Sequence, residues 1–188
     1  WSSDVCSSDL LARKWAMKGV KFINFYGPTE TTVYSHCEVI PADCEQITIG
    51  TTVNERVQQY VVDKDMNLLG PGEKGELLIG GIGVARGYHG KPEMTQKKFI
   101  SNPFGDKKGR LYRTGDLVVE LDDHRLLFHG RIDNQVKLRG FRVELGEVES
   151  NLISLDSVDE ACCIAKDQRL VAFVTPSSVD TKALIAEM

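Results

Sequence analysis

Short apolar runs separated by tight turns fill the middle of this chain, and they restrict its fold more than any other feature. The runs at 57–63, 76–79, 111–114 and 117–121 are rich in aliphatic, β-branched and aromatic residues, and each is shorter than a typical helix. Turn formers separate them, as in the Gly-Pro-Gly-Glu-Lys-Gly segment at 70–75. Short strands joined in this way indicate a small antiparallel β unit.

The pattern changes after Gly140. Four apolar residues then recur at i, i+3, i+7 and i+10, which is the spacing of one face of a helix: Leu145, Val148, Leu152 and Leu155. The apolar runs at 161–165 and 170–175 predict a pair of strands after this helix. We therefore expect a β-rich unit over 11–132 and a second, small α+β unit over 133–188.

The composition is that of an ordinary globular protein, since 41% of the 188 residues are hydrophobic and 27% are charged. A net charge of −4 offers no basic face to a phosphate backbone, so we expect no nucleic-acid partner. No apolar run reaches the roughly 18 residues of a membrane span, so we expect no membrane partner. No basic stretch leads into an apolar one near the start, so we expect no secretory signal.

The five cysteines are odd in number and show no metal-binding spacing, which predicts reduced thiols and a cytoplasmic location. The first ten residues differ in pattern from the rest of the chain and contain a repeat of Ser-Ser-Asp. We expect residues 1–10 to be a non-native or disordered head that carries no functional residue.

Four segments carry the chemistry. In chain order they read Asn-Phe-Tyr-Gly-Pro-Thr-Glu-Thr-Thr at 24–32, Gly-Gly-Ile-Gly-Val-Ala-Arg-Gly-Tyr at 80–88, Tyr-Arg-Thr-Gly-Asp-Leu at 112–117 and Gly-Arg-Ile-Asp-Asn-Gln-Val-Lys-Leu-Arg-Gly at 130–140. In this order they resemble the later signature motifs of the adenylate-forming enzymes, and they are most similar to those of the adenylation domains of nonribosomal peptide synthetases. The resemblance covers roughly residues 20–175.

The resemblance implies a fold and an activity. The fold is of mixed α/β and α+β class: the β-rich, distorted barrel-like end of a large nucleotide-binding subdomain, followed by part of a small α+β lid. The activity joins ATP to an amino acid or related carboxylate, which gives an aminoacyl adenylate and pyrophosphate, with Mg²⁺ as cofactor. The acyl group then passes to the phosphopantetheine thiol of a carrier-protein domain, in cis or in trans.

Adenylate formation attacks the α-phosphate of ATP with a carboxylate, so the site must hold two anions by means of donors and cations. In the first segment, Gly27 and the proline after it fix a turn that brings backbone close to a ligand. By resemblance, Thr29 donates to the α-phosphate, and the Glu30 carboxylate holds Mg²⁺ while substrate phosphates fill its other positions. An ordinary strand-to-loop turn with a capping threonine would also fit these residues.

Four further residues are assigned to nucleoside recognition. The ring of Tyr26 can stack on adenine, and the resemblance places Asn24 at the adenine edge. The Asp116 carboxylate can accept hydrogen bonds from both vicinal ribose hydroxyls, which is its role in the family. Arg131 matches a family arginine near the ribose and phosphate. The alternatives are a turn between strands for Asp116 and a surface salt bridge for Arg131.

Resemblance also assigns the positions after Arg131. Asp133 would be the hinge about which the lid rotates, because one site must first expel pyrophosphate and then admit a thiol. The loop of Lys137, Arg139 and Gly140 would swing toward that thiol, with a basic β-hairpin as the alternative. The glycine-rich segment 80–88 lacks the P-loop pattern and a following long helix, so we expect it to pack the β unit.

The pocket for the acyl side chain would include Phe25, Val33 and Tyr34, which hint at an apolar or constrained substrate. The sequence contains neither the upstream lysine loop nor the late lid lysine with which the family contacts phosphates. We therefore expect an internal fragment that does not adenylate by itself. Two other interpretations stay open: a fragment of an acyl- or aryl-CoA ligase, and a noncatalytic nucleotide-binding remnant.

Overall fold

The computed structural model of this chain describes residues 12, 14–44, 46–104, 109–133, 135–138, 141–166, 169–181 and 184. It divides into two compact units, one that ends at Ile132 and one that begins at Asp133. The expected head at 1–10, together with Arg139 and Gly140, lies outside the described residues. None of the helices in the described ranges combines the length and the hydrophobicity that a membrane crossing requires.

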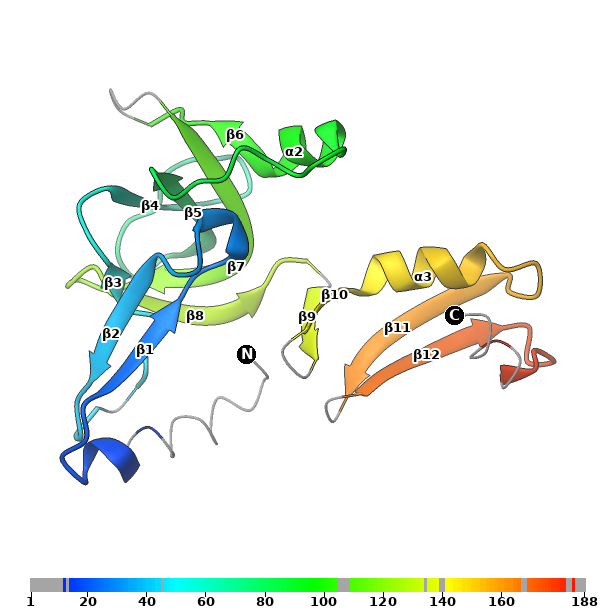
Figure 1. The fold of residues 1–188 in the computed structure, drawn as a ribbon, viewed down its shortest axis with the longest axis horizontal. Coiled ribbons are helices and arrows are strands. Elements are labelled where there is room, and N and C mark those ends of the chain that lie inside the picture. The colour runs from blue at the N-terminus through cyan, green and yellow to red at the C-terminus, as the bar shows by residue number, and fades with distance from the viewer. Residues whose placement is uncertain are drawn as a thin grey trace. The chain divides into compact units, whose positions relative to one another are not determined.

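The first unit starts with a three-stranded antiparallel sheet (Figure 1), made of β1 (Phe22–Tyr26), β2 (His36–Ile40) and β3 (Thr51–Thr52). A single 3-10 turn, η1 (Thr29–Thr31), follows β1. Because side chains alternate along a strand, Tyr26 is buried while Ile23 and Phe25, on the other face of β1, are exposed.

A second antiparallel sheet holds five strands: β4 (Val57–Val62), β5 (Lys74–Gly81), β6 (Phe99–Ser101), β7 (Arg110–Glu120) and β8 (Leu126–Arg131). Strand β7 pairs with β5 along one edge, and with β6 and then β8 along the other. The two strands expected at 111–114 and 117–121 are therefore one strand with an irregularity inside it. A helix, α2 (Pro92–Lys98), precedes β6.

A bridge between Gly50 and Leu126 connects the two sheets of the first unit. The described strands do not close into a barrel, so the expected barrel-like end is an open arrangement of two joined sheets. This open form leaves the outer face of β1 uncovered by any described strand, and Phe25 on that face is 50% exposed.

The core of the first unit lies on both faces of β5, where residues 75–80 are all buried. On one face, Leu77 and Ile79 pack in a cluster that also contains Tyr26. On the other face, Leu78 packs with Leu111 in a second cluster. Burial of apolar side chains on both faces stabilises β5 more than any edge strand, so it is a rigid base for groups attached to it.

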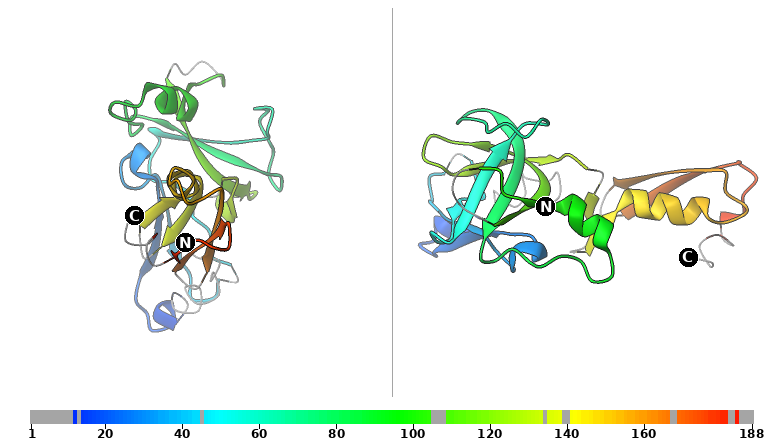
Figure 2. Two further views of the ribbon diagram at one scale, coloured as in Figure 1. Left: turned by 90° about the vertical axis from the view of Figure 1, so that its right-hand side faces the viewer. Right: turned by 90° about the horizontal axis from the view of Figure 1, so that it is seen from above.

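The second unit contains two hairpins and a helix: β9 (Gln135–Leu138), β10 (Phe141–Glu144), α3 (Leu145–Ile153), β11 (Glu160–Lys166) and β12 (Arg169–Thr175). The helix predicted from the apolar spacing is confirmed, and so are the two strands after it. Leu145 and Leu152 of α3 pack with Cys163 of β11. Figure 2 shows α3 running along the β11–β12 ribbon.

Candidate functional site

Tyr26, at the end of β1, reaches across to the second sheet. Its hydroxyl donates a 2.5 Å hydrogen bond to a carboxylate oxygen of Asp116 on β7. Burial, and the carboxylate of Asp116 beside it, raise the pKa of the Tyr26 hydroxyl well above its ordinary value. The hydroxyl therefore stays protonated at neutral pH and acts as a donor to Asp116.

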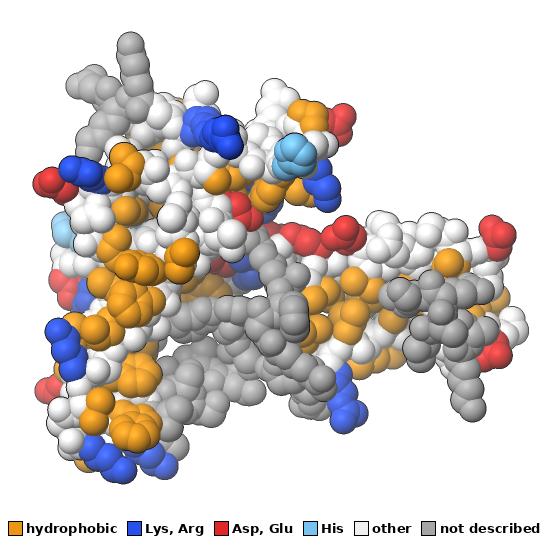
Figure 3. Space-filling view, in the orientation of Figure 1, with side chains coloured by type: hydrophobic (Ala, Val, Ile, Leu, Met, Phe, Trp, Pro, Cys, Tyr) orange, Lys and Arg blue, Asp and Glu red, His pale blue; other side chains and the backbone are white. Residues whose placement is uncertain are grey.

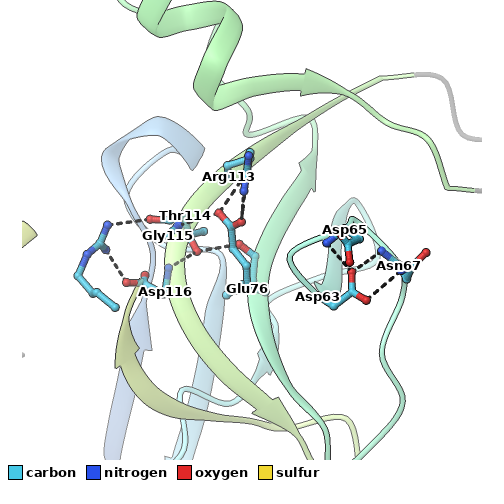
Figure 4. Close-up of polar contacts among 10 residues, drawn as sticks. Asp63, Asp65, Asn67, Glu76, Arg113, Thr114, Gly115 and Asp116 are labelled. Atoms are coloured by element: carbon cyan, nitrogen blue, oxygen red, sulfur yellow. Dashed lines mark hydrogen bonds and ion pairs between the residues drawn. The ribbon is translucent and has the colours of Figure 1, made fainter. Parts of the chain in front are cut away.

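Arg131 completes this cluster from the neighbouring strand. Its position on β8 pairs with that of Asp116 on β7, and its guanidinium forms an ion pair with the Asp116 carboxylate. It also donates a 2.9 Å hydrogen bond to the carbonyl of Thr114 (Figure 4). We refer to Tyr26, Asp116 and Arg131 as the nucleoside cluster, because they are three of the four residues that the sequence assigned to the nucleoside.

The turn proposed as the alternative for Asp116 does not fit the geometry, and the salt bridge proposed as the alternative for Arg131 is present but mostly buried. Asp116 lies inside β7 and is 6% exposed, so it does not form a turn between two strands. The side chain of Arg131 is 22% exposed and faces a carboxylate side chain that is 9% exposed, unlike a solvent-exposed surface pair. Three strands thus hold one partly neutralised carboxylate in a buried position.

Asn24 lies two residues before Tyr26 on the same strand. Its side-chain amide donates a 2.7 Å hydrogen bond to the carbonyl of Thr48. The hydroxyl and amide of Thr48 donate in turn to the carboxylate of Glu38 on β2, at 2.5 and 3.1 Å. These bonds fix the orientation of the Asn24 amide on the strand that also carries Tyr26.

The turn after Tyr26 depends on glycine at position 27. A Cβ atom at Gly27 would lie 2.3 Å from the Cα atom of Tyr34, which no real contact tolerates. The close approach lets the amide of Ser35 donate a 2.9 Å bond to the carbonyl of Tyr26. Thr29, in the η1 turn that follows, is exposed to solvent. The turn thus presents Thr29 at the surface, three positions after the buried Tyr26.

Glu30, also in η1, is held by the glycine-rich segment 80–88. The hydroxyl of Tyr88 donates a 2.7 Å hydrogen bond to its carboxylate, and the amide of Ala85 donates a 2.8 Å bond to its carbonyl. Burial and the adjacent Glu30 raise the pKa of Tyr88, which keeps this hydroxyl a donor. The ring of Tyr88 also packs edge-on against Phe99, at a centroid distance of 5.4 Å.

The segment 80–88 therefore does more than the packing that the sequence suggested. Tyr88 and Glu30 lie 58 positions apart in the chain, and nothing in the sequence around either residue signals that they meet. Only the arrangement of the two sheets brings this phenol to the carboxylate assigned to the metal.

Two of the residues assigned to the acyl pocket, Phe25 and Tyr34, lie on the opposite, exposed side of β1. The rings of Phe25 and Tyr34 contact each other at a centroid distance of 4.9 Å. Val33, which adopts a left-handed backbone with φ of 67°, is 73% exposed. Hydrophobic side chains gather over β1 and β2 in the space-filling view (Figure 3). The structure thus places Phe25 and Tyr34 on the opposite face of β1 from Tyr26.

The positions after Arg131 belong to the second unit, which is described by itself. Asp133 is its first residue, and the Asp133 carboxylate accepts a long 3.4 Å hydrogen bond from the amide of Gln135. Lys137 lies on β9, which pairs with β10 as an antiparallel hairpin, although its side chain is not among those described. The hairpin that the sequence left as an alternative is therefore present.

A metal ion would have to share its ligands with a nucleotide here. Among the described residues, no group of three or more His, Cys, Asp or Glu side chains could hold a metal. A single carboxylate such as Glu30, half-buried and anchored by Tyr88, suits Mg²⁺, which takes one or two carboxylates and fills its other positions with phosphates and water. The donor set fits Mg²⁺ bound together with ATP.

These features define a class. A model of the family described as AMP-binding enzyme matches residues 2–89. Together with the matches below, it places the chain among the adenylate-forming, AMP-binding enzymes. Malpinin synthetase of Mortierella alpina is 47% identical over 175 residues, which are 89% of this chain and 2% of the synthetase. The chain is therefore similar to a small part of this much longer synthetase.

Two solved structures agree with this assignment. PA1221, a nonribosomal peptide synthetase protein with adenylation and PCP domains, has a TM-score of 0.81 at 25% identity, over 99% of this chain and 39% of its own. AB3403, a four-domain nonribosomal peptide synthetase bound to AMP and glycine, is 43% identical with a TM-score of 0.60, over 93% of this chain and 14% of its own. The chain spans well under half of each of these proteins.

Proposed function

We propose that this chain supplies the nucleoside-binding wall and the first part of the lid of an amino-acid-activating adenylation domain. The reaction would join ATP and an amino acid to an aminoacyl adenylate and release pyrophosphate. One observation carries the proposal: Tyr26, Asp116 and Arg131, from three separate motifs, meet at one buried carboxylate. The same three positions are those that the family uses for adenine, ribose and phosphate.

The cluster suits recognition of a nucleoside. A carboxylate has about four lone-pair positions, so Asp116 can accept ribose hydroxyls beside the donors it already binds. Arg131 offsets its negative charge, which limits repulsion when a nucleotide polyanion approaches. The ring of Tyr26 would stack on adenine and the amide of Asn24 would meet its edge. These residues bind and orient the nucleoside and move no proton.

The η1 turn would act on the phosphates. Thr29, exposed at its start, would donate to the α-phosphate. Glu30 would hold Mg²⁺, which supplies charge neutralisation to the phosphates when bound. The hydrogen bond from Tyr88 would keep the Glu30 carboxylate turned toward its ligand. Charge stabilisation of this kind is the main catalytic contribution in reactions at phosphate.

We further propose that Asp133 is the hinge between the two half-reactions, and that 11–132 and 133–188 correspond to the large subdomain and the lid. Support comes from the division of the chain between Ile132 and Asp133. The loop of Lys137, Arg139 and Gly140, whose first residue lies on β9, would then swing toward the thiol of phosphopantetheine. The PCP domain of the similar protein PA1221 supports a carrier domain as the acceptor.

The amino-acid substrate would contact Phe25, Val33 and Tyr34. The exposed pair of rings supports an apolar or aromatic substrate side chain. The glycine bound to AB3403 supports an amino acid as the substrate class. We place the reaction in the cytoplasm, because the four cysteines of the described part are all free.

The test is amino-acid-dependent exchange of pyrophosphate into ATP, measured on the full-length gene product that carries these residues. We expect exchange with one or a few apolar amino acids, and we expect acyl transfer to a phosphopantetheinylated carrier domain. Transfer to free coenzyme A alone would favour the ligase interpretation. Binding of AMP without exchange for any of the twenty amino acids or common aryl acids would favour a noncatalytic remnant.

A further inference from the structure

The strand that carries Asp116 is irregular at that point. Glu76 on β5 pairs with Leu117 on β7, and Leu78 pairs with Arg113, so two steps along β5 correspond to four along β7. Gly115, in the middle of the extra residues, has a φ of 73°, which favours glycine. Bulges of this kind redirect side chains and are common beside active sites. The bulge is what turns Asp116 toward Tyr26 and Arg131.

A buried carboxylate on β5 fills the gap that the bulge opens. Glu76 is 6% exposed, and its carboxylate accepts a 3.2 Å hydrogen bond from the amide of Gly115 (Figure 4). It also accepts three bonds from Arg113, one of 2.5 Å from Nη2 and two of 3.2 and 3.4 Å from Nε. Glu76 therefore replaces the backbone carbonyl that a regular ladder would offer to Gly115.

The rest of the bulge is tied down by its own backbone and by Thr114. The hydroxyl of Thr114 donates 2.7 Å to the carbonyl of Leu77 and accepts 2.9 Å from the amide of Asp116. The carbonyl of Gly115 accepts from the amide of Ile132 at 2.8 Å. Arg131 contacts the carbonyl of Thr114, whereas Glu76 is the ionised group that contacts the amide of Gly115, and Gly115 lies next to Asp116 in sequence.

A carboxylate at this depth has a functional explanation. Burying an ion pair gives little net stability relative to apolar residues of the same size, because desolvation offsets the attraction. A charge-assisted hydrogen bond, however, fixes its donor more firmly than a neutral one. On the rigid base of β5, such a bond restrains the peptide that leads into Asp116.

We infer that Glu76 is a positioning residue that sets the orientation of Asp116 for recognition of the ribose hydroxyls. The inference rests on the proposed function, since it takes Asp116 to be the residue that binds the ribose. Glu76 acts through Gly115 and does not touch the nucleotide. Its loss should therefore weaken discrimination at the ribose more than binding of the base.

The experiment measures two dissociation constants by calorimetry on the full-length gene product, one for AMP and one for 2′,3′-dideoxy-AMP. Their ratio reports the ribose hydroxyls alone, because base and phosphate are the same in both. We expect a wild-type ratio of about tenfold or more, which is typical of hydrogen bonds to a charged group. Glu76→Gln should reduce the ratio by at least about threefold. A glutamine is neutral and replaces one acceptor oxygen by an NH2 donor, so it cannot keep the Gly115 amide and both Arg113 donors as partners.

Glu38→Gln is the matched control. Glu38 is also a buried carboxylate paired with an arginine, since the side chains of Glu38 and Arg125 are 8% and 37% exposed against 6% and 39% for Glu76 and Arg113. Its bonds go to Thr48, which binds the Asn24 amide on the adenine side, and not to the bulge, so any change in affinity should affect both nucleotides alike. Glu38→Gln should lower the free energy of unfolding about as much as Glu76→Gln does. It should keep the wild-type ratio of dissociation constants to within about twofold, because effects at independent sites add to within a few tenths of a kcal/mol.

The outcomes separate the inference from the proposed function. If the wild type shows no preference for AMP, or Asp116→Ala keeps it, the assignment of Asp116 fails. If Asp116→Ala removes the preference but Glu76→Gln retains it, the role of Glu76 is wrong. Should Glu76→Gln not fold, Glu76→Asp carries the test, because it keeps the charge and withdraws the carboxylate from Gly115. An unchanged ratio in a folded Glu76→Asp would overturn the inference.

Discussion

The two faces of β1 differ in burial and in their contacts with the rest of the chain. On the inner face, Tyr26 is 7% exposed and its hydroxyl is bonded to Asp116 of another sheet. On the outer face, Phe25 is 50% exposed and contacts only its neighbour Tyr34 among the ring pairs of the described residues. The side that we propose for the nucleoside is thus organised within this chain, whereas the side that we propose for the acyl group offers a surface. One strand of alternating residues can serve two ligands because its two faces are independent.

The largest effect should come from the centre of the inner face. Asp116→Ala removes the carboxylate that Tyr26 and Arg131 share, so we expect AMP affinity to fall by roughly 100-fold, the value of two hydrogen bonds to a charged group. Calorimetry on the full-length gene product measures this, with circular dichroism to confirm folding. Retention of AMP affinity in a folded variant would contradict an organised nucleoside side.

The next effect concerns pH. His36 lies opposite Tyr26 in the β1–β2 pair, and burial lowers its pKa from 6.5 to about 4. The unfolded chain therefore binds more protons than the folded one between these values, so stability is full above pH 6.5 and falls as the pH drops toward 4. The loss should be about 3 kcal/mol.

Chemical denaturation of the wild type and of His36→Gln, at a series of pH values, checks this dependence. The variant keeps a polar group near the Gln59 amide but has no proton to gain, so its stability should change less over this range. Equal slopes in the two proteins would show that another group carries the acid sensitivity, and that the inner face is not buried in solution.

A smaller effect should come from the link between η1 and the glycine-rich segment. Tyr88→Phe removes the donor to Glu30 and keeps the ring that packs on Phe99. We expect a three- to tenfold increase in the Mg²⁺ concentration that gives half-maximal pyrophosphate exchange, which corresponds to about one hydrogen bond. Unchanged KM for the amino acid is the internal control, and an unchanged Mg²⁺ requirement would exclude this role of Tyr88.

The smallest effect on nucleotide binding should come from the outer face. Phe25→Ala removes one of the two exposed rings, so we expect AMP affinity to change by less than about twofold. The preference among amino acids in pyrophosphate exchange should change by more than that. A large loss of AMP affinity would mean that the two faces of β1 are coupled and that the comparison fails.

Sequence patterns predicted the elements better than the contacts between them. The strands β4 and β5, the helix α3 and the ribbon of β11 and β12 follow from period and turn residues, because these signals are local. Gly115 suggested a turn inside 111–121, whereas it forms a bulge in a continuous strand. A single glycine signals a departure from regular backbone without saying which kind.

Resemblance named the members of the nucleoside cluster, and their meeting could not be derived from period or spacing. The same limit explains the two residues that sequence analysis missed. Glu76 lies 39 positions before Gly115, and Tyr88 lies 58 positions after Glu30. Each looks like an ordinary strand or loop residue, because its partner is supplied by the pairing of distant strands.

The hydrogen bond between Tyr26 and Asp116 also has an entropic consequence. Folding alone fixes the ring of Tyr26 in one orientation, since its hydroxyl is bonded and its side chain is buried in the core. A ligand that stacks on this ring therefore does not have to immobilise it, which would otherwise cost about 0.5–1.5 kcal/mol. The conformational entropy of the Tyr26 side chain is lost when the chain folds, before any nucleotide binds.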